Sequence, residues 1–218
     1  FIHEVKDSSN AARLIPFEFS TVQTYVLELG NQYIRFFKDK GIITESNVSI
    51  SGITKANPAV VTATGHSYNN GDHVIITSVG GMVEVNGKTF IVANKSTNTF
   101  ELTDVDGNNV NSSSFTTYTS GGVVNRIYQI TSPYAAADLS AIKFAQSADI
   151  MYLVHPDYSV RKLTRTGHTS WSLTEVDFTN GVYLPDNTTT TTLNPASHTV
   201  GTGVTVRSEE RRVGKECR

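Results

Sequence analysis

One stretch of the sequence, RKLTRTGHTSW, brings basic and aromatic residues together at short spacing. Cationic side chains can follow a nucleic-acid backbone, and an aromatic ring can stack on a base or a sugar. The pattern therefore predicts a weak contact site for a ligand or partner, formed by Arg161, Arg165, His168 and Trp171. The alternative is an ordinary strand with a solvated face, because Leu163 lies between the basic residues and would point inward.

Other patterns that could carry chemistry are incomplete. Glu175 and Asp177 share one face of an expected strand and could form an acid/base pair, although exposed strand charges are the simpler interpretation. The stretch DVDGN has the spacing that begins a calcium loop, but the twelfth position is Phe115 instead of glutamate, so a turn is expected. The six histidines lack zinc-ligand spacing, and no Gly-x-Ser-x-Gly occurs. We expect no enzyme activity, no catalytic residue, no cofactor and no metal.

The elements that would hold these residues are short strands. Residues 21–39, TVQTYVLELGNQYIRFFKD, predict a β-hairpin around Gly30-Asn31, with Tyr25, Leu27 and Leu29 on one face. From residue 50, short β-branched runs alternate with turn pairs, as in a small antiparallel barrel. Within them VEVNGKTFIV predicts a hairpin with a type I′ turn at Asn86-Gly87.

The second half of the chain predicts a meander. VVNRIYQITS reads as one strand, and YAAADLSAIKFAQSA is where a helical turn is expected. DIMYLVH, SVRKLTR and WSLTEVDF then predict three consecutive antiparallel strands, joined at Pro156-Asp157 and Gly167-His168. The Thr-rich stretch LPDNTTTTTLNPASHTVGTG predicts a loop or linker.

The last twelve residues, RSEERRVGKECR, differ in composition from the rest of the chain and hold its only cysteine, Cys217. A solvated tail or a nucleic-acid arm would explain the charge, but the peptide also resembles a translated sequencing adapter, the interpretation we favour. Because the chain begins without methionine, we expect an interior fragment. Without residues 207–218 there are 13 basic and 17 acidic residues, a net charge of −4 that opposes general binding to nucleic acid or anionic membranes. No apolar run reaches the ~20 residues of a membrane span.

Residues 132–178 resemble a family of bacteriophage tail proteins related to nozzle or tubular components of short tails. The likeness is carried by Pro133-Tyr134, Ala137–Leu139, Gln146–Asp149, His155-Pro156, Lys162-Leu163 and Trp171–Leu173, and RLIPFEFSTVQTYVLELGNQYIRFFKD is similar to the leading β-region of the same family. The resemblance covers residues 13–47 and 123 to about 206. It implies a noncatalytic structural component of a phage tail, which forms a ring with other copies and other tail proteins, with passing contact with DNA in the tail channel. The location would be the virion tail, after synthesis in the bacterial cytoplasm.

The middle segment resembles a different family, the first catalytic-cysteine half-domain (FCCH) of ubiquitin-activating enzymes. ITKANPAVVTATGHSYNNGDHVIIT and VNGKTFIVANKSTNTFELTD carry this likeness. No ubiquitin chemistry follows, because the segment has no cysteine to form a thioester. The likeness implies a small β-barrel inserted between YIRFFKD and RIYQITS of one outer domain.

We therefore predict an all-β fold: an antiparallel β-domain, of sandwich or propeller-like meander type, interrupted by an inserted barrel. The expected segments are the first part of the outer domain (1–47), the FCCH-like barrel (48–122), the continued outer domain (123–185), a Thr-rich linker (186–206) and the adapter-like end (207–218).

Two other functions remain open at this stage. The first is a carbohydrate- or host-receptor-binding module of the virion surface, for which Trp171, Tyr158 and Tyr183 are the candidate stacking residues. The second, ranked lower, is a polysaccharide-cleaving domain, which would require Glu175 and Asp177 to face a groove.

Overall fold

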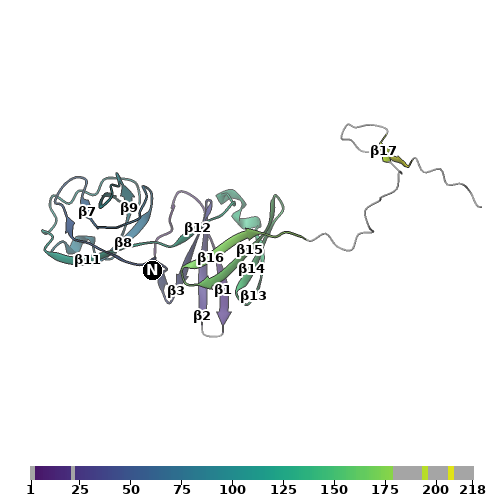
Figure 1. Cartoon of the computed structure of the whole chain (residues 1–218), viewed down its shortest axis with the longest axis horizontal. Helices are drawn as coiled ribbons and strands as arrows, with labels where there is room; N and C mark the ends of the chain where they lie inside the picture. The colour runs from purple at the N-terminus through teal and green to yellow at the C-terminus, as the bar shows by residue number, and fades with distance from the viewer. Residues whose placement is uncertain (1–2, 21–22, 179–192, 196–205, 209–218) are drawn as a thin grey trace, which may run out of the picture. The chain divides into compact units, whose positions relative to one another are not determined.

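The computed structural model describes residues 3–20, 23–178, 193–195 and 206–208 (Figure 1). The chain divides into two compact units, Phe1–Val176 and Asp177–Arg218. The first unit is built almost entirely of antiparallel strands, which confirms the predicted all-β class. Among the described residues, none of the helices has the length and apolar character needed to cross a membrane.

The first sheet of the outer domain has the order β1-β2-β3-β12, with β4 also paired to β3. Its strands are β1 (Arg13–Ser20), β2 (Gln23–Gly30), β3 (Tyr33–Lys38), β4 (Gly41–Ile42) and β12 (Gln129–Thr131). The predicted hairpin is confirmed: Gly30 pairs with Tyr33, and Tyr25, Leu27 and Leu29 are all fully buried. Gly30 is needed there because a Cβ atom would fall about 2 Å from the Tyr33 ring.

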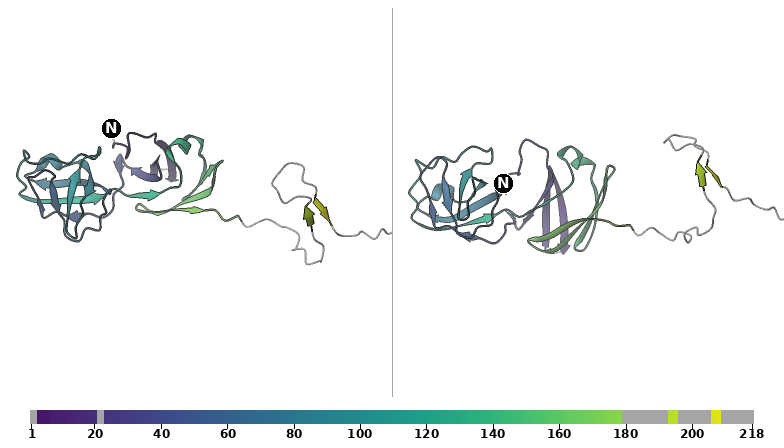
Figure 2. Two further views of the ribbon diagram at one scale, coloured as in Figure 1. Left: turned by 90° about the horizontal axis from the view of Figure 1, so that it is seen from above. Right: turned by 45° about the horizontal axis from the view of Figure 1, so that its top comes forward.

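The second sheet is a meander with the order β13-β14-β15-β16 (Figure 2). Its strands are β13 (Lys143–Ser147), β14 (Ile150–His155), β15 (Tyr158–Gly167) and β16 (Ser170–Glu175), and the 3₁₀ helix η2 (Ala136–Ala141) precedes them. The three consecutive strands and the helical turn predicted here are thus confirmed. The additional strand β13 lies in the second part of the segment expected to hold the turn.

The two sheets enclose one apolar core and form a sandwich. The first sheet contributes Ile15, Phe17, Tyr25, Leu27, Leu29, Ile34 and Phe36, and the second contributes Met151, Leu153, Leu163 and Trp171. These residues alternate along their strands with outward-facing ones, as the two-residue period of a strand requires. Burial of each large apolar side chain stabilises the fold by roughly 1.5–3 kcal/mol, which makes this core the main support of the outer domain.

The inserted segment forms a seven-stranded sheet with the order β5-β11-β8-β9-β10-β7-β6. Its strands are β5 (Val48–Ser49), β6 (Gly52–Ile53), β7 (Val60–Thr62), β8 (His73–Gly80), β9 (Lys88–Ala93), β10 (Thr99–Thr103) and β11 (Ser120–Arg126). The terminal strands of this order, β5 and β6, are consecutive in the chain, so the sheet curls until its two edges are neighbours. A separate core, with Val61, Ile76 and Phe100 fully buried, fills the interior.

The hairpin predicted within VEVNGKTFIV is wrong. Val83–Val85 is a short 3₁₀ helix, η1, and β9 pairs instead with β8. Asn86 explains the difference, because its side-chain amide bonds to both the backbone N–H and C=O of Val79 and so takes the place of a paired strand. Asn86 has φ −66° and ψ 134°, and only Gly87 has positive φ, so the pair has type II rather than type I′ geometry.

The single strand predicted at VVNRIYQITS is divided between two sheets. β11 continues the barrel sheet as far as Arg126, beyond the expected boundary at residue 122, whereas β12 joins the outer domain. Between them the N–H of Ile127 donates to the carbonyl of His73. β12 pairs with β3 although the whole barrel separates them in the chain, as an insertion requires.

In the second unit, β17 (Leu193–Pro195) pairs with β18 (Val206–Ser208). A strand therefore lies inside the segment predicted to be a linker. Most of that segment and the adapter-like end after Ser208 lie outside the described residues.

Candidate functional site

Trp171, the aromatic member of the predicted contact site, lies in the core of the sandwich. It is only 7% exposed, and its ring centroid is 4.3 Å from that of Phe36, in a stacked arrangement, and 4.8 Å from that of Phe17. Its indole N–H donates to the carbonyl of His168 at 3.1 Å, and its backbone N–H donates to the hydroxyl of Tyr128. Little of the Trp171 ring is therefore open to a ligand, and packing in the core accounts for its position.

Two other predicted residues, Arg165 and His168, meet Trp171 around Tyr25, which the sequence pattern placed on one face of the first hairpin but not in the contact site. The Tyr25 hydroxyl lies 2.7 Å from Nδ1 of the exposed His168, and the Arg165 guanidinium lies 5.1 Å from the centre of the Tyr25 ring. Arg165 also forms a 2.8 Å ion pair with Asp149. Three of the four predicted residues are thus brought together, but mostly by packing and ion pairing.

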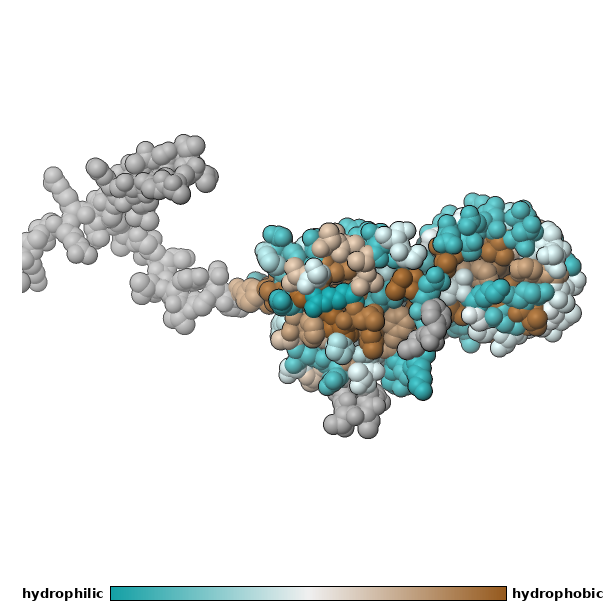
Figure 3. Space-filling model, turned by 180° about the vertical axis from the view of Figure 1, so that it is seen from behind, coloured by the Kyte–Doolittle hydropathy of each residue, from teal (hydrophilic) through white to brown (hydrophobic). Residues whose placement is uncertain are grey.

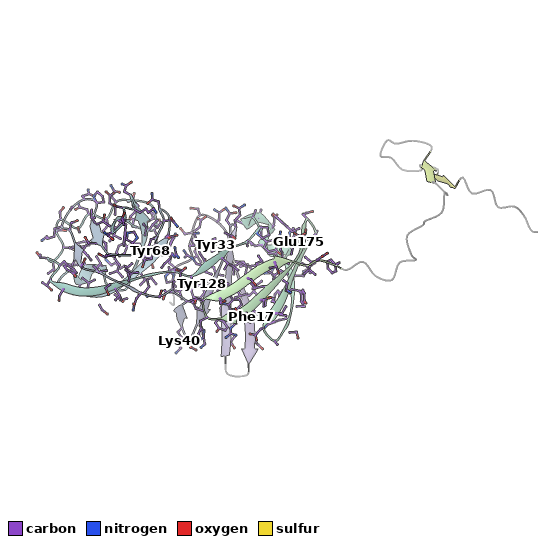
Figure 4. The ribbon with its side chains drawn as sticks, viewed as in Figure 1. Phe17, Tyr33, Lys40, Tyr68, Tyr128 and Glu175 are labelled. Atoms are coloured by element: carbon purple, nitrogen blue, oxygen red, sulfur yellow. The ribbon has the colours of Figure 1, made fainter. Side chains whose placement is uncertain are left out.

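Arg161 stands apart from this cluster and pairs with Glu175 at 3.6 Å. Glu175, at the end of β16 (Figure 4), and Asp177 are both exposed, as the interpretation as exposed strand charges expects. Of the proposed stacking residues, Tyr158 donates its hydroxyl to Asp138 at 2.6 Å, and Tyr183 lies outside the described residues.

The DVDGN stretch forms the expected turn. Oδ1 of Asp104 accepts hydrogen bonds from the backbone N–H groups of Asp106 and Asn108. The Asn108 bond is the main reason that the pKa of Asp104 lies below its usual value. Across the described part of the chain, no three His, Cys, Asp or Glu side chains are grouped closely enough to hold a metal ion.

A buried polar row crosses the outward side of the first sheet and was not foreseen. The register places Arg35 between Glu28 and Gln129, and both charged residues are almost fully buried. Glu28 accepts bonds from the Tyr33 hydroxyl at 2.6 Å and from the backbone N–H of Lys6 at 3.1 Å, while Arg35 donates to Gln129. Burial lowers the pKa of Arg35 to about 10. Glu28 and Arg35 occupy outward strand positions, so nothing in the local sequence indicated that they would be covered.

A second polar cluster joins the two segments by which the chain enters and leaves the barrel. Arg126 lies 2.6 Å from Glu45 and 3.0 Å from Asp72, and both carboxylates raise its pKa. These groups line a crevice of about 240 Å³ together with His73 and Gln129. Burial, followed by the nearby charge of Arg35, lowers the pKa of His73 to about 3. His73 is therefore neutral at physiological pH, and the cluster is suited to anchoring chain segments.

A hollow of about 640 Å³ lies on the barrel beside the N-terminal residues His3 and Glu4. Its lining combines aromatic and amide side chains, including Phe90, Asn109, Asn111 and Phe115, with His3 and Thr89, which are 3.0 Å apart. Such a mixture of flat apolar surface and hydrogen-bonding groups is typical of sites for small polar ligands.

Exposed apolar side chains form the remaining candidate, a surface for partners. Figure 3 shows apolar residues gathered on the outside of the sandwich as well as polar ones. On its strands the exposed fractions are 63% for Leu14, 38% for Val26, 41% for Phe144, 40% for Tyr152 and 43% for Val154.

Comparison with known proteins identifies the barrel alone. Residues 56–127 match the family model of the ubiquitin-activating enzyme E1 FCCH domain, which confirms the resemblance expected for the middle segment. The match ends at the residue that follows β11, in agreement with the boundary that the sheet pairing places there. No curated protein matches the chain. The inserted barrel is thus similar to the FCCH domain.

Proposed function

We propose that this protein is a noncatalytic structural component of a bacteriophage tail, of the nozzle or tubular type. The observation that carries the proposal is the architecture: an outer β-sandwich whose paired strands β3 and β12 are separated in sequence by an FCCH-like barrel. This is the arrangement implied by the resemblance of residues 13–47 and 132–178 to phage tail proteins. The residues that carry this resemblance in the second half lie mainly in η2 and the β13–β16 meander.

The role of such a protein lies in its interfaces. Its partners would be other copies of itself in a ring and further tail proteins, and its location would be the virion, after synthesis in the host cytoplasm. The net negative charge of residues 1–206 suits a channel wall along which DNA passes without binding.

Localisation tests this proposal directly. Antibodies raised against the chain are expected to label the tails of purified particles in negative-stain electron microscopy, and peptides of the chain should be present in the particle proteome. Particles that lack the chain, from cells in which it is expressed, would contradict the proposal.

A carbohydrate- or receptor-binding module is the second candidate, and the hollow on the barrel favours it. Phe115 and Asn111 lie on its wall, and its volume of about 640 Å³ is large enough for a short glycan. A glycan array probed with the chain and with an Asn111→Ala variant separates the two functions: specific binding that the substitution removes would support the second.

We further propose that residues 207–218 are a translated sequencing adapter. A long DNA read across the codons for Val206 and Arg207 tests this. A different continuation of the reading frame is expected, and a genomic match to all twelve residues would refute the adapter origin.

A further inference from the structure

Four of the five exposed apolar side chains on the sandwich strands occupy two distinct faces. The fifth, Phe144, pairs with the buried Leu153 and so lies on the core side of β13. Within the described residues eight large apolar side chains are exposed, and five of them lie on sandwich strands: Leu14, Val26, Phe144, Tyr152 and Val154. Contiguous apolar patches on a soluble domain usually mark an interaction surface. The position of each side chain in its sheet then decides what kind of partner fits.

The first surface, which we call the lysine face, consists of Lys143, Tyr152, Val154 and Lys162. Tyr152 and Val154 alternate along β14 with the fully buried Met151 and Leu153, so they point away from the core. The register places Tyr152 beside Lys162 of β15, and Val154 opposite Lys143 of β13. Two apolar side chains are thus flanked by two cations on one side of the second sheet.

The second surface, the glutamate face, consists of Leu14, Pro16, Glu18 and Val26. Along β1 the first three alternate with the fully buried Ile15 and Phe17. Pro16 pairs directly with Val26 of β2, which places their side chains together. This face is also apolar, but its charged member, Glu18, is an anion.

The two faces lie on the outer sides of different sheets, because each of them points away from the core that the two sheets enclose. The lysine face of one copy therefore cannot meet its own glutamate face, but it can meet that of a second copy. Apolar surface would be buried between them, and the charges have opposite sign. Contact between two lysine faces would instead place Lys143 and Lys162 against like charges, which costs free energy.

We propose that copies of this chain associate head to tail, with the lysine face of one packed on the glutamate face of the next. A contact between two different surfaces repeats from copy to copy and yields a ring if it closes, or a filament if it does not. The proposal rests on the proposed function and deepens it by naming the surfaces through which subunits join.

Sedimentation velocity of the full chain over a range of concentrations tests the contact. Wild-type protein is expected to self-associate, and more weakly at high salt, because salt screens the charge pairs. Tyr152→Glu on one face and Leu14→Lys on the other should each weaken self-association by at least about tenfold, because each places a repelling charge in the contact. Val83→Glu, at a position on the barrel that is 59% exposed, is the matched control and should not change it.

Mixing the two variants gives the sharpest readout. The Leu14→Lys copy keeps an intact lysine face and the Tyr152→Glu copy keeps an intact glutamate face, so an equimolar mixture should form a mixed dimer through these two intact faces, at concentrations at which neither variant associates alone. Circular dichroism spectra and melting temperatures equal to those of wild type establish that both variants fold. Two further substitutions, Lys143→Glu and Glu18→Lys, should each weaken self-association when made alone. Combined in one chain, they exchange the two charges across the contact and should restore association in part.

Several outcomes would overturn the proposal: wild-type protein that is monomeric at every concentration, variants that associate like wild type, or a mixture that forms no mixed dimer. These experiments distinguish refutation of the proposed contact between the two faces from refutation of the proposed function. A chain found in phage tails whose face variants assemble normally overturns only the faces, and a chain that assembles through them but is absent from tails overturns only the function.

Discussion

Trp171 offers the clearest test of whether the RKLTRTGHTSW stretch serves packing or ligand contact. Its ring lies 4.3 Å from Phe36, 4.8 Å from Phe17 and 5.3 Å from Tyr25, measured between ring centroids, and only 7% of the residue is exposed. Trp171→Ala would leave a cavity at the centre of the sandwich. Substitutions of this kind lower the free energy of unfolding by about 3–5 kcal/mol.

A loss of that size is large compared with the total stability of a domain, about 5–15 kcal/mol. It should lower the melting temperature of the sandwich by at least about 6 °C, since each 1 kcal/mol corresponds to roughly 2–4 °C or more. Differential scanning calorimetry is the suitable assay, because the substitution removes the only tryptophan and with it the fluorescence signal.

Two further variants calibrate the measurement. Trp171→Phe keeps most of the ring packing but loses the indole N–H bond to His168, and should cost about 1–2 kcal/mol. Phe178→Ala removes an aromatic side chain that is 65% exposed and should change stability by less than about 0.5 kcal/mol. If Trp171→Ala melts within about 1 °C of wild type, the residue does not support the core and the argument against a surface platform fails.

Three other predictions concern the barrel and its connection to the chain. Arg126→Gln should lower the free energy of unfolding in urea by about 1–3 kcal/mol, because two partly buried carboxylates lose their cation; an unchanged midpoint would contradict this. Burial lowers the pKa of His73 from 6.5 to about 3, so the unfolded state binds more protons between these values, and stability should fall as pH drops below about 6.5, by about 2 kcal/mol at pH 5. His73→Leu should remove this contribution to the difference in the free energy of unfolding between pH 7 and pH 5, as measured by urea titration. An equal loss of stability between the two pH values in both proteins would refute the assignment. Gly81→Ala should destabilise the barrel strongly, because its φ is +81° and a Cβ would fall 2.1 Å from the Thr117 carbonyl, whereas Gly87→Ala, at φ +72° with open space around it, should cost only about 1–2 kcal/mol in the same thermal melt.

Local patterns in the sequence were sufficient for most of the strands. Alternation placed Tyr25, Leu27 and Leu29 on the buried face of the first hairpin, and turn residues at Pro156-Asp157 and Gly167-His168 marked the meander. These features depend on the two-residue period of a strand and on turn chemistry, both of which are local. The FCCH-like character of the barrel was also evident from sequence, since residues 56–127 match that family.

Which side of a strand is covered, and by what, was decided only by the tertiary structure. Trp171 looked like a surface aromatic among basic residues, yet Phe17 and Phe36 of the other sheet enclose it. Glu28 and Arg35 occupy strand positions between those of the apolar core residues, yet both are buried, with the backbone of Lys6 bonded to Glu28. In each case the partner is remote in the chain or lies on another sheet, so no local pattern records it.

The turn that forms at Asn86-Gly87 differs from the predicted one for the same reason. A type I′ hairpin requires a strand on each side, but Asn86 bonds to Val79, seven residues earlier, and the preceding residues form a short helix instead. The sequence by itself thus determined the class of fold, most of the strands and the FCCH-like character of the inserted barrel. Sheet-to-sheet packing determined which polar and aromatic residues are buried and which apolar residues stay exposed, because burial depends on surfaces that meet only when distant segments fold together.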